Sequence, residues 1–157
     1  MNILALDLGC STGFATLING SIRSGVEHWK HRTNESAGMK YLRFDQWLID
    51  IYGLGDFDLI AYEKPHGLQG NAVESMNGYI TGIHRFIAQR ESTQNKRINY
   101  QAVSPATIKK WATGNGRASK EDMGAWFGRE IGRIAATYDE ADALALLTFV
   151  MQELGVE

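Results

Sequence analysis

The sequence predicts a mixed α/β domain with one five-stranded sheet flanked by helices. The length of 157 residues fits one ordinary domain, so we expect a single domain over residues 1–157. Hydrophobic residues make up 44% of the chain and charged residues 22%, which is typical of a folded globular protein. Short strand-like apolar runs alternate with stretches of helical periodicity, and this alternation predicts the α/β fold class.

The first three strands are expected to form a meander. An apolar run over residues 2–8 includes Asp7, and a second run covers residues 12–18. Asn19-Gly20 is typical of a tight hairpin turn, so a third strand follows near residues 21–29.

Helices and strands alternate in the middle of the chain. Apolar residues recur at helical spacing from Glu35 to Tyr52, with glycines just beyond. The run 57–62 is a buried strand that leads to Glu63 and a loop. A helix over about residues 71–90 and a strand over 98–103 follow.

Capping signals mark helices after the last strand. Ser104-Pro105 is typical of an N-cap followed by proline at the first helical position. Ser119 and Asp122 resemble a capping box. We summarise the whole order as β-β-β-α-β-α-β-α-α. The helical segments in this part of the chain span residues 105–111, 119–133 and 139–154.

Basic residues are concentrated in one segment. From Arg85 to Lys120 there are eight Lys and Arg residues and one acid, Glu91. This segment therefore carries +7 and the remainder −9, within a net charge of −2. Such segregation favours a nucleic-acid partner, although two solvated helix faces would also produce it.

Cysteine content and hydropathy predict a cytoplasmic protein without membrane contact. Cys10 is the one cysteine and cannot form an intramolecular disulfide. No run reaches the roughly 18 apolar residues of a membrane span, and the N-terminus lacks the pattern of a signal peptide.

Four carboxylates stand where a hydrophobic core would not place them. Asp7 and Glu63 end apolar strands, while Asp139 and Asp142 share one side of the last helix. The first and fourth strands are expected to be parallel neighbours, which brings the four acids together. They would repel one another unless cations intervene, and oxygen ligands select Mg²⁺ or Mn²⁺. The pattern predicts a two-metal phosphodiester hydrolase.

Each acid taken alone has an ordinary structural explanation. Asp139 would serve as a helix N-cap, and Asp142 would interact favourably with the helix dipole. Asp7 before a glycine would form a turn, and Glu63 would end a strand in solvent. The conjunction of all four on one topology favours a site.

Four segments of the sequence carry a family resemblance. In chain order they are LALDLGCSTGFA, LIAYEKP, TIKKWATGNGRASKEDM and DEADALALL. They resemble the RuvC-type Holliday junction resolvases of the RNase H-like superfamily, from residue 2 to about residue 150. The resemblance implies an RNase H-like fold and a homodimeric endonuclease that cuts four-way DNA junctions. It also implies two Mg²⁺ ions per active site, for which Mn²⁺ can substitute. The short length is similar to that of phage-encoded members.

The resemblance also assigns residues. It implies that Asp7, Glu63, Asp139 and Asp142 are the metal-binding catalytic acids. Lys120 is expected to assist catalysis at the cleaved strand. The residues expected to contact DNA are Lys109, Lys110, Asn115, Arg117, Lys120, His66, Arg85 and Arg90.

Two features leave alternatives open. Cellular resolvases have an aromatic residue three positions after the strand glutamate, where this chain has His66, which would either stack on bases or be solvated. The stripe of Met76, Tyr79, Ile80 and Ile83 would serve either a dimer interface or the core.

Other functions fit parts of the pattern. One is a broader endonuclease for forks, flaps and three-way branches, and another is a junction-binding protein without catalysis. The segment ALDLGCSTG also resembles actin-like kinases and ATPases, but no second glycine-rich phosphate motif follows a strand. Four costly carboxylates argue against a purely binding role.

Overall fold

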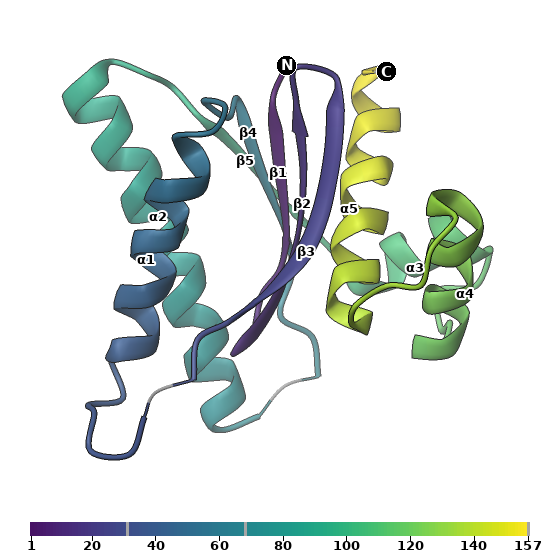
Figure 1. Cartoon of the computed structure of the whole chain (residues 1–157), viewed down its shortest axis with the longest axis horizontal. Helices are drawn as coiled ribbons and strands as arrows, with labels where there is room; N and C mark the ends of the chain where they lie inside the picture. The colour runs from purple at the N-terminus through teal and green to yellow at the C-terminus, as the bar shows by residue number, and fades with distance from the viewer. Residues whose placement is uncertain (31, 68, 157) are drawn as a thin grey trace.

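The computed structural model describes residues 1–30, 32–67 and 69–156. It has a five-stranded sheet with helices on both faces (Figure 1). Helices α1 and α2 cover one face, and α5 covers the other, with α3 and α4 packed on its outer side (Figure 1). The strands are β1 (Ile3–Asp7), β2 (Ser11–Ile18), β3 (Ser21–His28), β4 (Leu59–Glu63) and β5 (Asn99–Val103). The helices are α1 (Met39–Tyr52), α2 (Asn71–Gln94), α3 (Pro105–Thr113), α4 (Lys120–Ile131) and α5 (Tyr138–Leu154).

The predicted order is confirmed except at its end, where three helices follow β5 instead of two. Each of these helices starts within one residue of a predicted helical segment. Helix α1 begins at Met39, later than expected. The carboxylate of Glu35 instead accepts hydrogen bonds from the Arg32 backbone N–H at 2.8 Å and from the Arg43 guanidinium at 2.6 Å, which hold the preceding loop.

The predicted caps of α3 and α4 are present. The hydroxyl of Ser104 accepts a hydrogen bond from the backbone N–H of Thr107 at 3.3 Å. In the capping box, the Ser119 hydroxyl accepts from the Asp122 N–H at 3.1 Å, and the Asp122 carboxylate accepts from the Ser119 N–H at 2.9 Å. Both caps satisfy backbone donors that the helix itself leaves unpaired.

The sheet has the order β3-β2-β1-β4-β5. Strands β1, β2 and β3 pair antiparallel, with Asn19 and Gly20 at φ values of 50° and 79° in the tight turn. Strands β1 and β4 pair in parallel, as predicted, and their register ends at the pair Leu6 and Tyr62. The next residue of each strand is the predicted acid, so both acids lie at one edge of the sheet.

Two hydrophobic cores lie on the two faces of the sheet. Successive side chains of a strand point to opposite faces, and accordingly Ile3 and Ala5 pack towards α5, whereas Leu4 and Leu6 pack towards α1 and α2. All four side chains are fully buried. Among the described residues, no helix combines the length and the apolar character needed to cross a bilayer.

Gly13 allows helix α5 to rest directly on strand β2. It pairs with Asp7 across the β1–β2 ladder. A Cβ atom at this position would lie 1.9 Å from the backbone oxygen of Asp139 and 2.8 Å from the backbone nitrogen of Glu140. The absent side chain therefore sets how closely the start of α5 approaches the acid at the end of β1.

Replacing Gly13 by Ala is expected to lower the free energy of unfolding by about 3 kcal/mol, because the methyl group forces two backbone segments apart. Urea unfolding followed by circular dichroism measures this. Gly38→Ala is the matched control, since its nearest neighbouring atom would be 3.9 Å away. A loss at Gly13 no larger than at Gly38 would contradict the close packing.

Candidate active site

Asp7 and Glu63 lie side by side at the carboxyl ends of β1 and β4. The alternation that points Ala5 and Ala61 into the core beneath α5 also points both acids to that face. The strand ends therefore present two carboxylates to the helix that carries the other two.

Helix α5 supplies Asp139 from its first turn and Asp142 from the next turn. Thr137, and not Asp139, caps this helix, because the Thr137 hydroxyl accepts a hydrogen bond from the Glu140 N–H at 3.2 Å. One oxygen of Asp139 accepts a hydrogen bond from the Ser11 hydroxyl at 2.8 Å. Oδ1 of Asp142 is buried and has no hydrogen-bond donor. An unsatisfied buried carboxylate oxygen is costly, so it is available for a cation.

Burial and mutual repulsion raise the pKa values of three of these carboxyls. Burial, reinforced by the charges of Glu63, Asp142 and Asp139, holds the pKa of Asp7 well above its usual value. Burial raises the pKa of Glu63 to about 7, with Asp142 adding to the rise. Burial also raises the pKa of Asp142 to about 6. The four acids therefore form one electrostatic cluster.

Two predicted lysines lie beside this cluster. The charge of Lys109, from α3, opposes the rise in pKa at Glu63 and Asp142. The charge of Lys120, the first residue of α4, does the same at Asp7 and Asp142. Both lysines thus place positive charge near the acids from helices packed outside α5.

The end of α3 and the loop that follows it carry further predicted residues. Lys110 lies in α3 and Arg117 in the loop, and both are exposed. The Asn115 side chain shapes the loop, because its carbonyl oxygen accepts a hydrogen bond from the Arg117 backbone N–H at 2.9 Å. The loop therefore presents Arg117 near the start of α4.

Three other predicted DNA-contacting residues lie outside the segment from α3 to α4. His66 is exposed in the segment that follows β4. Arg85 forms an ion pair with Asp45 at 2.5 Å, and the guanidinium of Arg90 lies 5.1 Å from the centre of the Tyr52 ring. Both arginines belong to α2, on the opposite face of the sheet, so these contacts with DNA remain predictions.

The apolar stripe of α2 belongs largely to the core. Tyr79 and Ile83 are fully buried, and Met76 and Ile80 pack against the same core. Core packing therefore accounts for Tyr79 and Ile83, whereas Met76 and Ile80 keep part of their surface exposed.

An ion pair between the buried Glu140 and the exposed Arg133, which was not predicted, braces the start of α5. Glu140 is 1% exposed. It accepts hydrogen bonds from the Ser24 hydroxyl at 2.7 Å, from the Ala136 N–H at 2.6 Å and from the Arg133 guanidinium. Burial opposes ionisation, but the bond from Arg133 leaves the pKa of Glu140 below its usual value. The sequence offered one signal for this ion pair, which is that Glu140 is an acid at the start of a largely apolar helix.

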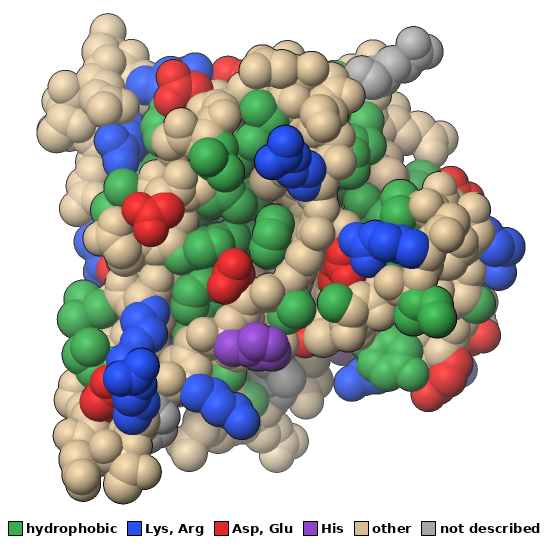
Figure 2. Space-filling view, in the orientation of Figure 1, with side chains coloured by type: hydrophobic (Ala, Val, Ile, Leu, Met, Phe, Trp, Pro, Cys, Tyr) green, Lys and Arg blue, Asp and Glu red, His purple; other side chains and the backbone are tan. Residues whose placement is uncertain are grey.

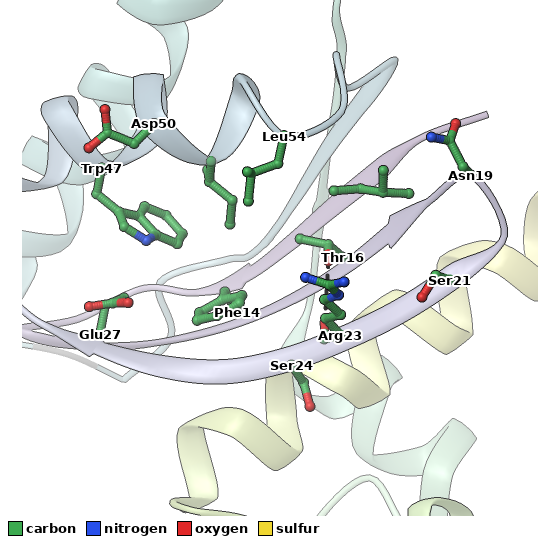
Figure 3. Close-up of a pocket in the computed structure, with 12 residues that line it drawn as sticks. Phe14, Thr16, Asn19, Ser21, Arg23, Ser24, Glu27, Trp47, Asp50 and Leu54 are labelled. Atoms are coloured by element: carbon green, nitrogen blue, oxygen red, sulfur yellow. Dashed lines mark hydrogen bonds between the residues drawn. The ribbon is translucent and has the colours of Figure 1, made fainter.

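One cavity lies away from the acids. It has a volume of ≈710 Å³ between β2, β3 and α1, and its walls include Phe14, Arg23, Glu27, Trp47 and Leu54 (Figure 3). In the space-filling view, hydrophobic side chains gather on this side between α1 and β3 (Figure 2). This cavity is on the α1 face of the sheet, and the acids are on the α5 face.

The carboxylates do not stand in a finished metal cage. Within residues 1–30, 32–67 and 69–156, no three His, Cys, Asp or Glu side chains are close enough to hold an ion as they stand. Like charges repel, so a cation would have to draw the side chains inwards. The all-oxygen donor set and the unpaired Asp142 oxygen suit Mg²⁺ or Mn²⁺.

Comparisons with known proteins identify the fold. No protein-family model and no curated protein matches this sequence. A structure of Thermus thermophilus RuvC in complex with a Holliday junction substrate has a TM-score of 0.75 at 18% identity, over 99% of this chain and 96% of that one. The yeast mitochondrial Holliday junction resolvase Ydc2 has a TM-score of 0.63 at 13% identity, over 96% of this chain and 77% of that one. Fowlpox virus resolvase, solved with Holliday junction DNA, has a TM-score of 0.60 at 14% identity, over 98% of this chain and 99% of that one. The chain has the RuvC-type, RNase H-like α/β fold.

The raised pKa values predict that the metal-free protein loses stability as pH rises from 5 to 7.5. Carboxyls titrate near pH 4 in the unfolded chain, whereas Glu63 has a pKa of about 7 and Asp142 of about 6 when folded. The folded state therefore binds more protons across this interval, and deprotonation favours unfolding. Thermal melting in EDTA at each pH measures the slope.

Asp142→Asn should flatten this slope, because it removes one titrating group and one repelling charge. Asp50→Asn, on the exposed side of α1, is the control and should leave it unchanged. An equal slope in the wild type and Asp142→Asn would show that the cluster does not strain the fold.

Proposed function

We propose that this protein is a metal-dependent endonuclease that cuts branched DNA, chiefly four-way junctions. The observation that carries the proposal is the convergence of Asp7, Glu63, Asp139 and Asp142 from three elements on one face of the sheet. The fold supports it, because two of the similar structures are described with Holliday junction DNA. The charges of Lys109 and Lys120, which act on the acids, fit a polyanionic substrate.

The four carboxylates would hold two Mg²⁺ ions, with Mn²⁺ able to substitute. Bound ions would supply Lewis acidity at the scissile phosphate and a water nucleophile of lowered pKa. The Ser11 hydroxyl orients Asp139 through its 2.8 Å hydrogen bond. A bound ion would also pair with the buried Oδ1 atom of Asp142, which has no hydrogen-bond donor in the protein. The expected products carry 5′-phosphate and 3′-hydroxyl ends.

The basic residues would stabilise the transition state and position the DNA. Lys120, beside Asp7 and Asp142, stabilises the negative charge that grows on the phosphate during cleavage. Lys109, whose charge acts on Glu63, would position the cleaved strand. Lys110 and Arg117 are exposed and contact backbone phosphates without reading sequence.

A four-way junction also suggests the assembly. Such a junction has two equivalent strands to cut, and one chain of this length offers one cluster of acids. A homodimer with twofold symmetry would present two clusters to the two strands. We therefore infer that the protein acts as a homodimer.

Cleavage of a panel of labelled DNAs with Mg²⁺ tests the function. The panel contains a four-way junction, a three-way branch, a fork, a flap and a plain duplex, and the cut sites are mapped. Paired incisions in the four-way junction are expected. Equal cutting of all branched DNAs would favour the broader endonuclease, and binding without cutting would favour the non-catalytic alternative.

Replacing any one of the four acids by its amide should lower the cleavage rate by at least about 100-fold. Even the loss of a group that only hydrogen-bonds a metal ligand lowers metal affinity or activity roughly 10- to 100-fold. The variants are Asp7→Asn, Glu63→Gln, Asp139→Asn and Asp142→Asn. Junction affinity should persist. Mg²⁺ should also raise the melting temperature of the wild type at pH 7.5 but not that of these variants. Wild-type rates in any two variants, or full activity in excess EDTA, would refute the site.

Lys120→Ala should lower the single-turnover rate at saturating protein by roughly 100-fold, because it removes an interaction with the developing charge. Lys110→Ala should instead weaken affinity and reduce its salt dependence by about one unit of slope. A salt-titrated dissociation constant for each variant completes the comparison. Normal cutting by saturated Lys120→Ala would make that lysine a positioning residue.

A further inference from the structure

A second groove opens directly beside the acids. It lies between the first turns of α4, the segment 134–137 and the start of α5, and has a volume of ≈660 Å³. Asp139 and Lys120 line this groove and also belong to the acidic cluster and its surroundings. A DNA strand held at the acids would therefore run along its edge.

Two large apolar side chains line the groove and face solvent. Ile134 is 91% exposed and Tyr138 is 43% exposed. Single exposed apolar residues are common on protein surfaces, but these two flank one concave site next to charged groups. The Nζ atom of Lys120 lies 6.0 Å from the centre of the Tyr138 ring, which places a cation at the edge of the aromatic surface.

Gly124 leaves space beside the Cδ1–Cε1 side of the Tyr138 ring. It lies within helix α4, where glycine is less favourable than alanine. A Cβ atom at this position would lie 3.5 Å from Cε1 of Tyr138, an ordinary contact distance, with no closer neighbour. Packing therefore does not require glycine here, and its effect is to keep one part of the ring uncovered.

We propose that this groove binds an unpaired nucleobase of the DNA strand held at the acids, with Tyr138 as the stacking surface. A base has flat apolar faces that suit an aromatic ring, and stacking tolerates any base. The adjoining phosphate would lie towards Lys120, which complements its charge. This inference rests on the proposed function and adds a contact that favours DNA with unpaired nucleotides next to the cut.

The test is a double-mutant cycle between protein and DNA. After the wild-type cut site is mapped, an abasic site is placed in turn at each nucleotide flanking it in a four-way junction. Affinities for intact and abasic junctions are measured in Ca²⁺ for the wild type and Tyr138→Ala. We expect Tyr138→Ala to weaken binding of the intact junction about tenfold. At one flanking position the abasic site should weaken the wild type similarly and Tyr138→Ala hardly at all.

Companion variants separate the stacking role from stability. Tyr138→Phe keeps the ring and should bind within about twofold of the wild type. Gly124→Ala should melt at a higher temperature yet bind the junction more weakly, because its methyl group covers the Cδ1–Cε1 side of the ring. Tyr100→Ala, an exposed tyrosine of β5, is the matched control and should bind like the wild type.

The outcomes are distinct. Additive effects of Tyr138→Ala and the abasic site at every position would overturn the nucleobase proposal, even if Tyr138→Ala alone binds weakly, because the groove would then contact sugar or phosphate. Normal affinity of Tyr138→Ala would overturn it as well. If the wild type neither binds nor cuts branched DNA, the proposed function itself fails.

Discussion

The contact between strand β2 and the first turn of α5 is the constraint on which the site depends. Gly13 has no side chain, and the backbone of Asp139 occupies the place where one would be. Because Gly13 is also the ladder partner of Asp7, this one contact positions the helix acids against the strand acids. The ion pair of Glu140 with Arg133 holds the same turn from its other side.

The site is built at a cost to the fold. Burial and repulsion raise the pKa values of Asp7, Glu63 and Asp142, and raised values mean that ionising these carboxyls at neutral pH destabilises the folded state. The two cores on either side of the sheet offset that cost. The lysines at positions 109 and 120 relieve part of it, and bound cations would relieve more.

The similar structures share 13–18% of their residues with this chain over at least 96% of its length. Such divergence is compatible with one fold, because a pattern of buried and exposed positions specifies the architecture with many different sequences. Chemistry depends instead on particular groups at particular places. The proposed function therefore rests on the acids and lysines, and His66 and Tyr138 are the positions at which substrate selectivity is open to test.

The sequence by itself determined the local elements and the candidate acids. Apolar periodicity, the Asn19-Gly20 turn and the Ser119 capping box act over a few residues, and the structure has each of them. The β1–β4 pairing also followed from the order of elements, so the meeting of Asp7 and Glu63 was predictable.

Only the tertiary structure decided contacts between distant segments. Arg85 was paired with Asp45 on the face away from the acids. The role of Gly13 and the groove at Tyr138 likewise depend on which backbone comes close to which. Local patterns carry no information about such distances, because they arise when helices and sheet pack together.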